Sequence, residues 1–385
     1  MRCWRCAHES PVPTAFLLGR GEQCWQNATT ARASPRLRVL PAEPGVWDSG
    51  RGLTRSEVES SMAKGLKDAT RTKDKERDFA LGRVIAIVND KGGVGKTSIA
   101  ANLAGQFAGA GYRCLLVDLN RQANLADDLG YRGTDVDDQG AGLLGSVLAG
   151  TQLVPSLNVR PLLDVVCGGA RLEDLTPIMV SRLQHRGRMA FRVLGDVLAP
   201  IATEYELVFI DCPPESTILS DLALSAARWV LMPTKSDVGG LVGMTLVAER
   251  FALAQEVNPR LGLLGVVLFA TGSRSRAIQS EALRAIDNAF GGESPRFATT
   301  IRHAERTAQD ARRLGKLAHE LEIEVAAQPA WWKVLRQEIK TPRVSATAVS
   351  VAGDYRALGV EVLTALQKAE ETDQAAASGG APASA

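Results

Sequence analysis

Cysteine is scarce in this chain, and long apolar runs are missing from it. Of its 385 residues only six are cysteines, and three of these, Cys114, Cys167 and Cys212, stand in short apolar runs where buried thiols are common. So few cysteines fit a reducing cytoplasm better than a disulfide-stapled secreted protein. No apolar stretch approaches the roughly 20 residues that span a bilayer, so we expect no membrane helix. The net charge of +2 does not by itself predict a polyanionic partner.

The first 80 residues lack the periodicity of folded structure. They mix Pro, Gly, Ser and Arg without a period of 2 or 3.6 residues, so we expect 1–80 to be a low-complexity, disordered extension. An upstream start codon is the alternative, with Met62 as the natural first residue. A zinc site is disfavoured because its candidate ligands lack a second close pair. These candidates are Cys3, Cys6, His8 and Cys24.

Residues 81–370 alternate apolar runs with helical patterns. Strands separated by helices predict a single α/β domain with a mostly parallel central sheet, flanked by helices on both faces. A one-sided helix over 354–366 is expected to pack on this domain, and 371–385, rich in Ala, Ser and Gly, is expected to be a disordered tail. The expected strands are Val84–Val88, Cys114–Leu119, Leu163–Val166, Leu207–Ile210, Trp229–Met232 and Leu263–Phe269.

A phosphate-binding loop follows the first of these strands. Its glycines permit a tight turn that points backbone amides at a phosphate, Lys96 brings charge to the outer phosphates, and the Thr97 hydroxyl suits Mg²⁺. The segment therefore predicts a nucleoside triphosphate site. Its residues are Lys91, Gly92, Gly93, Val94, Gly95, Lys96, Thr97 and Ser98. The general pattern does not call for a lysine at position 91, so this second charge requires an explanation.

Two later strands each end in an aspartate. Asp118 follows Leu115–Val117, and Asp211 follows Leu207–Ile210. Open parallel sheets place their ligand sites at the carboxyl ends of strands. A carboxylate there can hold Mg²⁺ directly or through water, so we assign Asp211 with Thr97 to the metal and Asp118 to a metal-bound water.

With these motifs in place, the chain resembles the ParA-type partition ATPases, members of the deviant Walker A group of P-loop NTPases, over about residues 82–370. The loop 91–97 matches in full, 211–214 matches the second switch and 116–124 resembles the first. The resemblance implies an ATP hydrolase with ATP and Mg²⁺ as cofactors. It also implies a homodimer that forms on ATP, in which Lys91 reaches the partner subunit's phosphates. A solvated surface lysine is the alternative.

The first switch departs from the family at a chemically important position. The family usually reads Asp-x-Asp-Pro-Gln-Gly-Asn, whereas this chain has Asn120, Arg121 and Ala123 at the second Asp, the Pro and the Gly. In the family that aspartate positions the attacking water. An amide is a poor proton acceptor, so we expect ATP binding with slow hydrolysis. A nonhydrolytic ATP-dependent DNA-binding scaffold is the alternative. The residues assigned to catalysis are Lys91, Lys96, Asp118 and Asn120.

Recognition of the base is assigned to the segment Pro233–Asp237. In ATPases of this type the matching stretch lies near the nucleotide or the dimer contact, so Pro233 is a predicted cofactor contact. The alternative is an ordinary strand-to-helix loop with Asp237 as a helix N-cap.

A local excess of arginine lies between residues 271 and 316, where nine basic side chains face five acidic ones. Arginine suits phosphate contacts, which supply most nonspecific DNA affinity. Solvated helix faces are the alternative. The resemblance favours DNA, because partition ATPases carry nucleoid-binding arginines in the matching segments. The predicted DNA contacts are Arg274, Arg276, Arg302 and Arg306.

The resemblance also implies a partner and a location. In the family a separate ParB-type protein recognises the centromere, and we expect this chain to segregate a plasmid or chromosome on the nucleoid. A MinD-like membrane-cycling ATPase is disfavoured because Glu370, Glu371 and Asp373 follow the final helix. A reductase resembling the nitrogenase iron protein is disfavoured because Cys167 has no plausible second cysteine ligand.

Overall fold

The structure is a computed structural model that describes residues 72–214, 216–235, 249–271, 284, 296–328 and 343–378. Contacts divide the chain into units Met1–Val58 and Glu59–Ala385, and every described residue belongs to the second unit. Arg274 and Arg276, the zinc candidates and Asp237 lie outside the described residues.

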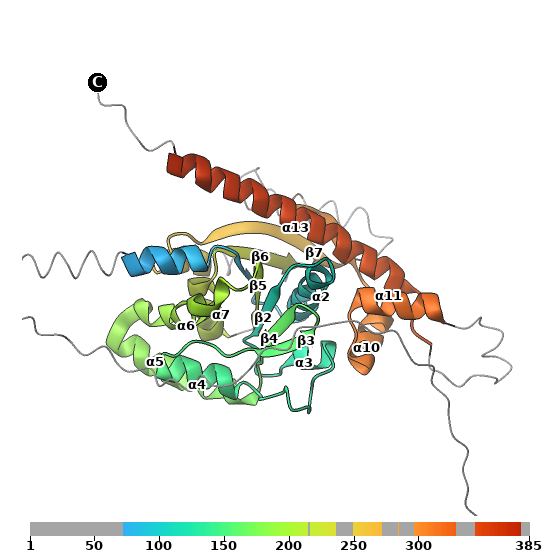
Figure 1. Cartoon of the computed structure of the whole chain (residues 1–385), viewed down its shortest axis with the longest axis horizontal. Helices are drawn as coiled ribbons and strands as arrows, with labels where there is room; N and C mark the ends of the chain where they lie inside the picture. Colours follow the sequence, from blue (N-terminus) through green and yellow to red (C-terminus); the bar gives the residue numbers. More distant parts are fainter. Residues whose placement is uncertain are drawn as a thin grey trace, which may run out of the picture. The chain divides into compact units, whose positions relative to one another are not determined.

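One eight-stranded sheet forms the centre of the described chain (Figure 1). Its strand order is β3-β4-β2-β5-β1-β6-β7-β8, and the pairs are parallel except for β3 with β4. The predicted mostly parallel sheet is therefore confirmed. The strands are β1 (Val84–Ile87), β2 (Cys114–Asp118), β3 (Ser156–Arg160), β4 (Leu163–Val166), β5 (Leu207–Asp211), β6 (Trp229–Thr234), β7 (Gly262–Thr271) and β8 (Arg296–Arg302).

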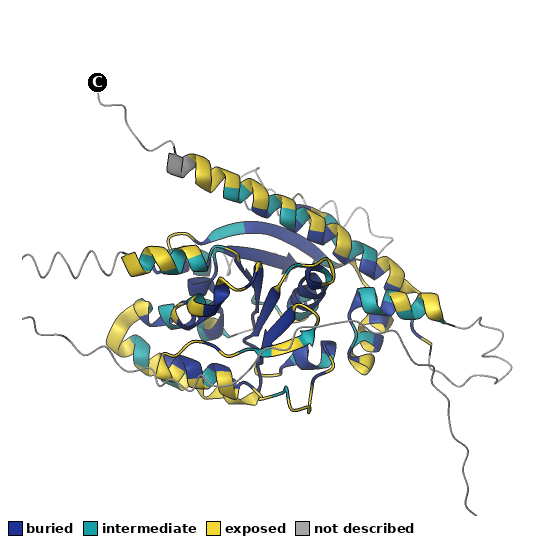
Figure 2. Cartoon of the chain, in the orientation of Figure 1, coloured by how far each residue is buried: buried dark blue, intermediate teal, exposed yellow. Residues whose placement is uncertain are grey.

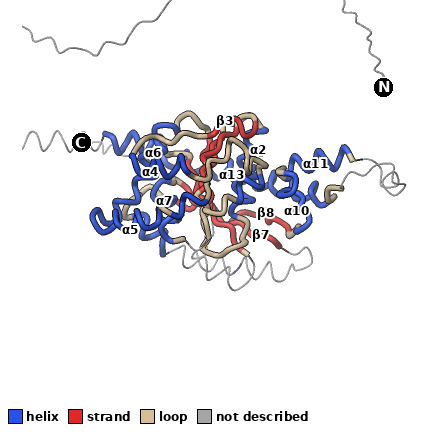
Figure 3. The backbone as a smooth tube through the Cα atoms, turned by 90° about the horizontal axis from the view of Figure 1, so that it is seen from below, coloured by secondary structure: helices blue, strands red, loops and turns tan. Residues whose placement is uncertain are grey.

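Helices cover both faces of the sheet (Figure 3). One face carries α4 (Ala141–Ala149), α5 (Leu175–Arg186), α6 (Val193–Ala202) and α7 (Thr217–Ala226). The other carries α2 (Lys96–Gly109), α3 (Asn124–Asp128), α10 (Glu305–Leu314), α11 (Ala318–Ala327) and α13 (Thr347–Ser378). Two short 3₁₀ helices, η1 (Ala170–Glu173) and η2 (Gly187–Arg192), flank α5.

The central strands are buried because both faces are covered (Figure 2). In β1, Val84 and Ala86 pack into the core on the α4–α7 side, while Ile85 and Ile87 pack on the α2 side. A strand with two buried faces reads as a continuous apolar run, which explains why β1, β2 and β5 were predictable from sequence. Within the described chain, no helix is long and apolar enough to cross a membrane.

Several boundaries differ from the prediction. Strands β3 and β8 were not predicted, and residues 72–80, assigned to the extension, are helical. The final helix spans Thr347–Ser378, so the first part of the predicted tail at 371–385 is helical. Ion pairs explain this extension, because Glu370 pairs with Arg83, and Asp373 pairs with Arg228. Glu370 and Asp373, which in the sequence read as part of an acidic helix flank, thus contact the body of the domain.

Candidate nucleotide site

The loop between β1 and α2 has the backbone that phosphate binding requires. Gly93 and Gly95 have φ of 70° and 85°, a conformation that side chains with a Cβ rarely adopt. A Cβ at Gly95 would also overlap the ring of Phe269, which lies at the end of β7. The loop therefore needs glycine at this position for both its conformation and its close packing.

Replacing Gly95 with alanine is expected to destabilise the protein and abolish nucleotide binding. Positive φ and overlap with Phe269 act together, so we expect a loss of about 2–4 kcal/mol in the free energy of unfolding. Denaturant unfolding and nucleotide titration would measure both effects. Gly109→Ala is the matched control, because no atom lies within 4 Å of a Cβ built there. Equal stability of the two variants would contradict the packing argument.

Hydrogen bonds tie this loop to the neighbouring strand. The Lys96 ammonium donates to the carbonyl oxygen of Lys91 at 2.9 Å, and the Lys91 amide donates to Asn89 Oδ1 at 2.8 Å. Asn89 Nδ2 in turn donates to the carbonyl of Pro233 at 2.7 Å. Pro233 is buried within β6, and the cavity described below does not include it, so the structure places it as a support behind the loop.

The two predicted carboxylates meet at the carboxyl ends of adjacent parallel strands. Asp118 on β2 and Asp211 on β5 are register partners, and both are fully buried. The Thr97 hydroxyl donates to Asp211 Oδ2 at 2.6 Å. Burial raises the pKa of both carboxyls, and the charge of Asp211 raises that of Asp118 further.

Among the described residues, one oxygen on each carboxylate has no hydrogen-bond partner, namely Asp118 Oδ2 and Asp211 Oδ1. A buried carboxylate oxygen without a partner is costly unless a cation or water satisfies it. Two such oxygens beside a threonine hydroxyl form an all-oxygen donor set, which is the type that Mg²⁺ prefers. The residues present therefore fit a magnesium ion.

The first switch is a tightly hydrogen-bonded loop. The Asn120 amide donates to Asp118 Oδ1 at 2.8 Å, and Asn120 Oδ1 accepts the Gln122 amide at 3.0 Å. Ala123 has φ of 48°, which explains physically why the family has glycine at this position. Arg132 donates to the carbonyl oxygens of Gln122 at 2.9 Å and Ala123 at 2.8 Å.

Gly168 is a site residue that sequence reasoning missed. A Cβ there would lie 2.6 Å from Asp118 Cγ and 2.7 Å from the carbonyl oxygen of Asn120. Only glycine lets this turn after β4 pack directly on the switch. The Gly168-Gly169 pair beside Cys167 is a usable signal, which the sequence does not connect with the switch because Cys167 reads there as a buried thiol or a cluster ligand.

A cavity of about 440 Å³ opens over the loop and the switch. Its wall includes the loop residues Gly93, Gly95, Lys96, Thr97 and Ser98 together with Asn120. The far wall comes from distant segments that the sequence did not connect with the site: the β8–α10 turn, α11 and α13. His303 of the turn, Ala318 of α11 and Tyr355 of α13 are among these contributions, and Asn102 of α2, Phe269 of β7 and Arg312 of α10 also line the cavity. Lys91 does not line the cavity and is half-buried beside it.

Comparison with known proteins decides the family. A family model described as an AAA domain matches residues 82–263. The chromosome partitioning protein ParA of Myxococcus xanthus is 36% identical over 209 residues, covering 52% of this chain and 69% of that protein. ParA of Caulobacter vibrioides is 32% identical over 267 residues, covering 68% and 95%. The chromosome-partitioning ATPase Soj of Treponema pallidum is 30% identical over 258 residues, covering 63% and 97%.

The chain belongs to the ParA/Soj family of partition ATPases. The resemblance inferred from the motifs is therefore confirmed. Solved structures support the fold: an ATP complex of McdA from Cyanothece has a TM-score of 0.53 at 20% identity, covering 68% of this chain and 98% of McdA. The cell division ATPase MinD of Pyrococcus furiosus has a TM-score of 0.51 at 23% identity, covering 74% and 99%.

The two described arginines predicted to contact DNA are placed differently in this ParA/Soj-type domain. Arg302 forms a bidentate pair with Asp354 of α13, with Nε and Nη2 each 2.7 Å from a carboxylate oxygen. Arg306, at the start of α10, is exposed and makes no ion pair with another described residue. Arg302 thus braces β8 against α13 with a side chain that is still exposed, and Arg306 is accessible to an anionic ligand.

Proposed function

We propose that this chain is an ATP-dependent DNA-partitioning ATPase that dimerises on ATP, binds duplex DNA without sequence preference and hydrolyses ATP slowly. One arrangement carries the proposal. The phosphate loop with Lys91 and Lys96 faces two register-paired carboxylates, each of which keeps one oxygen without a partner in the part of the chain that the structure describes. This set suits a magnesium nucleotide at the edge of the sheet where parallel folds bind ligands.

ATP and Mg²⁺ are the cofactors that this site suits. The backbone amides of the loop and the Lys96 ammonium would bind the phosphates, with Lys96 exchanging the Lys91 carbonyl for a phosphate oxygen. Thr97 and Asp211 would hold the metal, and Asp118 would accept a hydrogen bond from a metal-bound water. A magnesium ion held there would supply positive charge next to the phosphates, which favours transfer of the γ-phosphate.

Dimerisation is proposed to depend on Lys91. Lys91 is half-buried and is not among the residues that line the described cavity, whereas Lys96 is. A lysine next to a triphosphate can instead pair with phosphates presented by a second copy, where each charge meets its opposite. The nucleotide would then bind within one subunit and join two.

DNA binding is proposed for Arg306 of α10, and for Arg274 and Arg276 from the sequence resemblance. Arg306 is exposed and lies next in sequence to the cavity residues Glu305 and Thr307. The relatives that match this chain are partition proteins, so a ParB-type centromere-binding partner and a place on the nucleoid are proposed on the same basis.

Anisotropy of a labelled duplex of arbitrary sequence tests this proposal together with phosphate release. The full chain with Mg²⁺ and ATP should bind the duplex, whereas protein without nucleotide should bind at least about tenfold more weakly. Affinity should fall steeply as salt rises from about 50 to 200 mM, because phosphate contacts release counterions. The proposal would be overturned by a DNA affinity that is equal with and without nucleotide. It would also be overturned by tight binding that does not weaken as salt rises.

Arg306→Ala should weaken DNA binding without affecting the nucleotide. Loss of one phosphate contact per subunit predicts a fall of about tenfold in the affinity of a dimer, with the salt slope reduced by about 2. The charge-matched control is Arg171→Ala, at an exposed arginine of η1 on the opposite side of the sheet. The measurement is the slope of log DNA affinity against log salt concentration for both variants. Equal slopes would show that Arg306 does not contact DNA phosphates.

A nonhydrolytic ATP-dependent scaffold is the second candidate, and Asn120 favours it. The side-chain oxygen of Asn120 already accepts the Gln122 amide, which leaves an NH₂ group that cannot accept a proton. Phosphate release on adding DNA and the partner separates the two candidates. A partition ATPase would release phosphate faster, whereas a nonhydrolytic scaffold would keep its ATP intact.

A further inference from the structure

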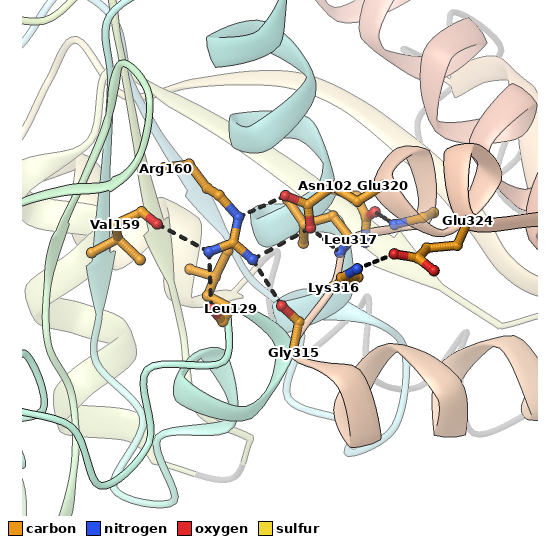
Figure 4. Close-up of polar contacts among 10 residues, drawn as sticks. Asn102, Leu129, Val159, Arg160, Gly315, Lys316, Leu317, Glu320 and Glu324 are labelled. Atoms are coloured by element: carbon orange, nitrogen blue, oxygen red, sulfur yellow. Dashed lines mark hydrogen bonds and ion pairs between the residues drawn. The ribbon is translucent and has the colours of Figure 1, made fainter. Parts of the chain in front are cut away.

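The guanidinium of Arg160 connects three separate segments beside the nucleotide site (Figure 4). Arg160 ends the edge strand β3, and its Nε donates to Glu320 Oε1 of α11 at 2.6 Å. Nη1 donates to the carbonyl oxygen of Leu129 at 3.1 Å, and Nη2 to that of Gly315 at 2.8 Å. Lysine could not replace this set, because it lacks the planar fork of donors.

The backbones joined by Arg160 are in close contact with each other. Leu129 is the C-cap of the short α3 helix and Gly130 follows it, while Gly315 is the C-cap of α10 in the turn to α11. A Cβ at Gly130 would lie 3.0 Å from Gly315 Cα, and both glycines have positive φ, 70° and 60°. The ends of α3 and α10 therefore pack backbone to backbone, and a relative shift would strain both turns.

A third contact reinforces this junction from the cavity side. Arg312 of α10 pairs with Asp128 of α3, with 3.5 Å between Nε and Oδ1. Asp128 is buried, and its burial raises the pKa of the carboxyl to about 6. We call the contacts of Arg160, Gly130–Gly315 and Asp128–Arg312 the α3–α10 joint.

The α3 side of the joint is continuous with the first switch. Arg132 clamps the carbonyl oxygens of Gln122 and Ala123, where α3 begins, and pairs with Asp127 within α3. Residues 120–132 are thereby held as one hydrogen-bonded unit. A displacement of Asn120 when a nucleotide binds cannot be absorbed before it reaches Gly130, because this short segment is braced along its length.

We propose that the α3–α10 joint transmits the nucleotide state of the first switch to α10, and that Arg160 is the positioning residue that makes this coupling possible. The DNA part of the inference rests on the proposed function, because α10 carries Arg306. The coupling itself concerns only two segments of this chain. It requires that bound nucleotide favour one position of the switch, which is how a ligand shifts a two-state element.

Amide hydrogen exchange tests the joint without DNA. On adding Mg²⁺ and ATP to the full chain, exchange should slow severalfold in both 120–132 and 305–314. In Arg160→Lys the response of 120–132 should remain and that of 305–314 should be lost. Both measurements are repeated with the additional substitution Lys91→Ala, which is expected to keep the protein monomeric. Any slowing of exchange in α10 that remains cannot then come from dimer contacts. A retained α10 response in Arg160→Lys, or none in the wild type, would overturn the inference.

Arg182→Lys is the matched control, because Arg182 also donates to two backbone carbonyls, those of Val147 at 3.0 Å and Leu148 at 3.1 Å, far from the switch. It should leave the α10 response intact. If Arg160→Lys does not fold, Arg312→Gln at an exposed side chain replaces it and should reduce the response.

A DNA-binding measurement then tests whether the joint affects function. In the wild type, ATP should increase DNA affinity at least about tenfold, and in Arg160→Lys this ratio should fall towards 1 with ATP affinity unchanged. If the DNA affinity of the wild type is the same with and without ATP, the proposed function is wrong. The hydrogen-exchange experiment then still tests whether the joint couples the switch to α10. If the ratio stays at the wild-type value in a folded Arg160→Lys protein, the joint does not control DNA binding.

Discussion

Asn120→Asp should raise the ATP turnover number by about 10- to 100-fold, an effect of the size that a general base contributes. The variant keeps the oxygen that accepts the Gln122 amide at 3.0 Å, so the switch loop should retain its shape. It replaces the NH₂ group with a second carboxylate oxygen, which can orient water and accept its proton. Phosphate release at saturating ATP is the measurement.

The same substitution should carry a cost in the absence of nucleotide. Position 120 is buried, and its amide already bonds to Asp118, which lies in register with Asp211. A third carboxylate in this group should destabilise the metal-free protein by about 1–3 kcal/mol through like-charge repulsion and burial. Mg²⁺ and ATP should restore most of the loss, which thermal unfolding with and without the ligand would show.

Asn124→Asp is the control for Asn120→Asp. It makes the same chemical change at another amide in the cavity wall, at the first residue of α3, where a negative charge suits the helix dipole. Its turnover should change by less than about threefold. If Asn120→Asp binds Mg²⁺ and ATP normally and turns over at the wild-type rate, water activation does not limit this enzyme.

Lys91→Ala should abolish ATP-dependent dimerisation, with a loss of at least about 100-fold in the association constant, or about 2.7 kcal/mol. Two backbone atoms of Lys91 support the loop: its carbonyl accepts Lys96 Nζ and its amide donates to Asn89. The substitution leaves those atoms in place, so ATP affinity of the monomer should change only a few-fold. Light scattering coupled to size exclusion would give the oligomeric state, and calorimetry the nucleotide affinity.

Lys368→Ala is the control for Lys91→Ala, because it removes an equal charge from an exposed position on α13. It should dimerise as the wild type does. Dimerisation of Lys91→Ala at wild-type concentrations of protein and ATP would show that Lys91 is a solvated surface lysine. Loss of ATP binding in the monomer would instead place its side chain in its own site.

The parts of the fold that could be predicted have a local chemical signature. Strands β1, β2 and β5 are buried on both faces, so their sequences are unbroken apolar runs. The edge strand β3, Ser156–Arg160, is partly exposed and contains Ser, Asn and Arg, which read as a loop. The last turns of α13 have a tail-like composition, yet their Glu, Gln and Ala residues are good helix formers, and ion pairs of Glu370 and Asp373 with distant arginines attach them to the domain.

In the candidate site, too, some residues could be predicted from local sequence and others could not. Glycine spacing and two lysines identify the phosphate loop because turn geometry and phosphate charge demand those residue types locally. The roles of Gly168 and Phe269 depend on which backbone approaches them, and no local pattern records that. Likewise, Arg302 and Arg306 look equivalent in sequence, and only the position of Asp354 on α13 separates a structural brace from an accessible arginine.

The sequence by itself determined the α/β class, the loop that suits a triphosphate and the departure at Asn120, because each rests on residues that are neighbours along the chain. The tertiary structure decided which distant groups meet. It set Asp118 beside Asp211 through the register of β2 and β5, and it brought Arg160 against Gly315 across 155 residues. Such contacts depend on how strands and helices pack in three dimensions, so sequence patterns alone do not specify them.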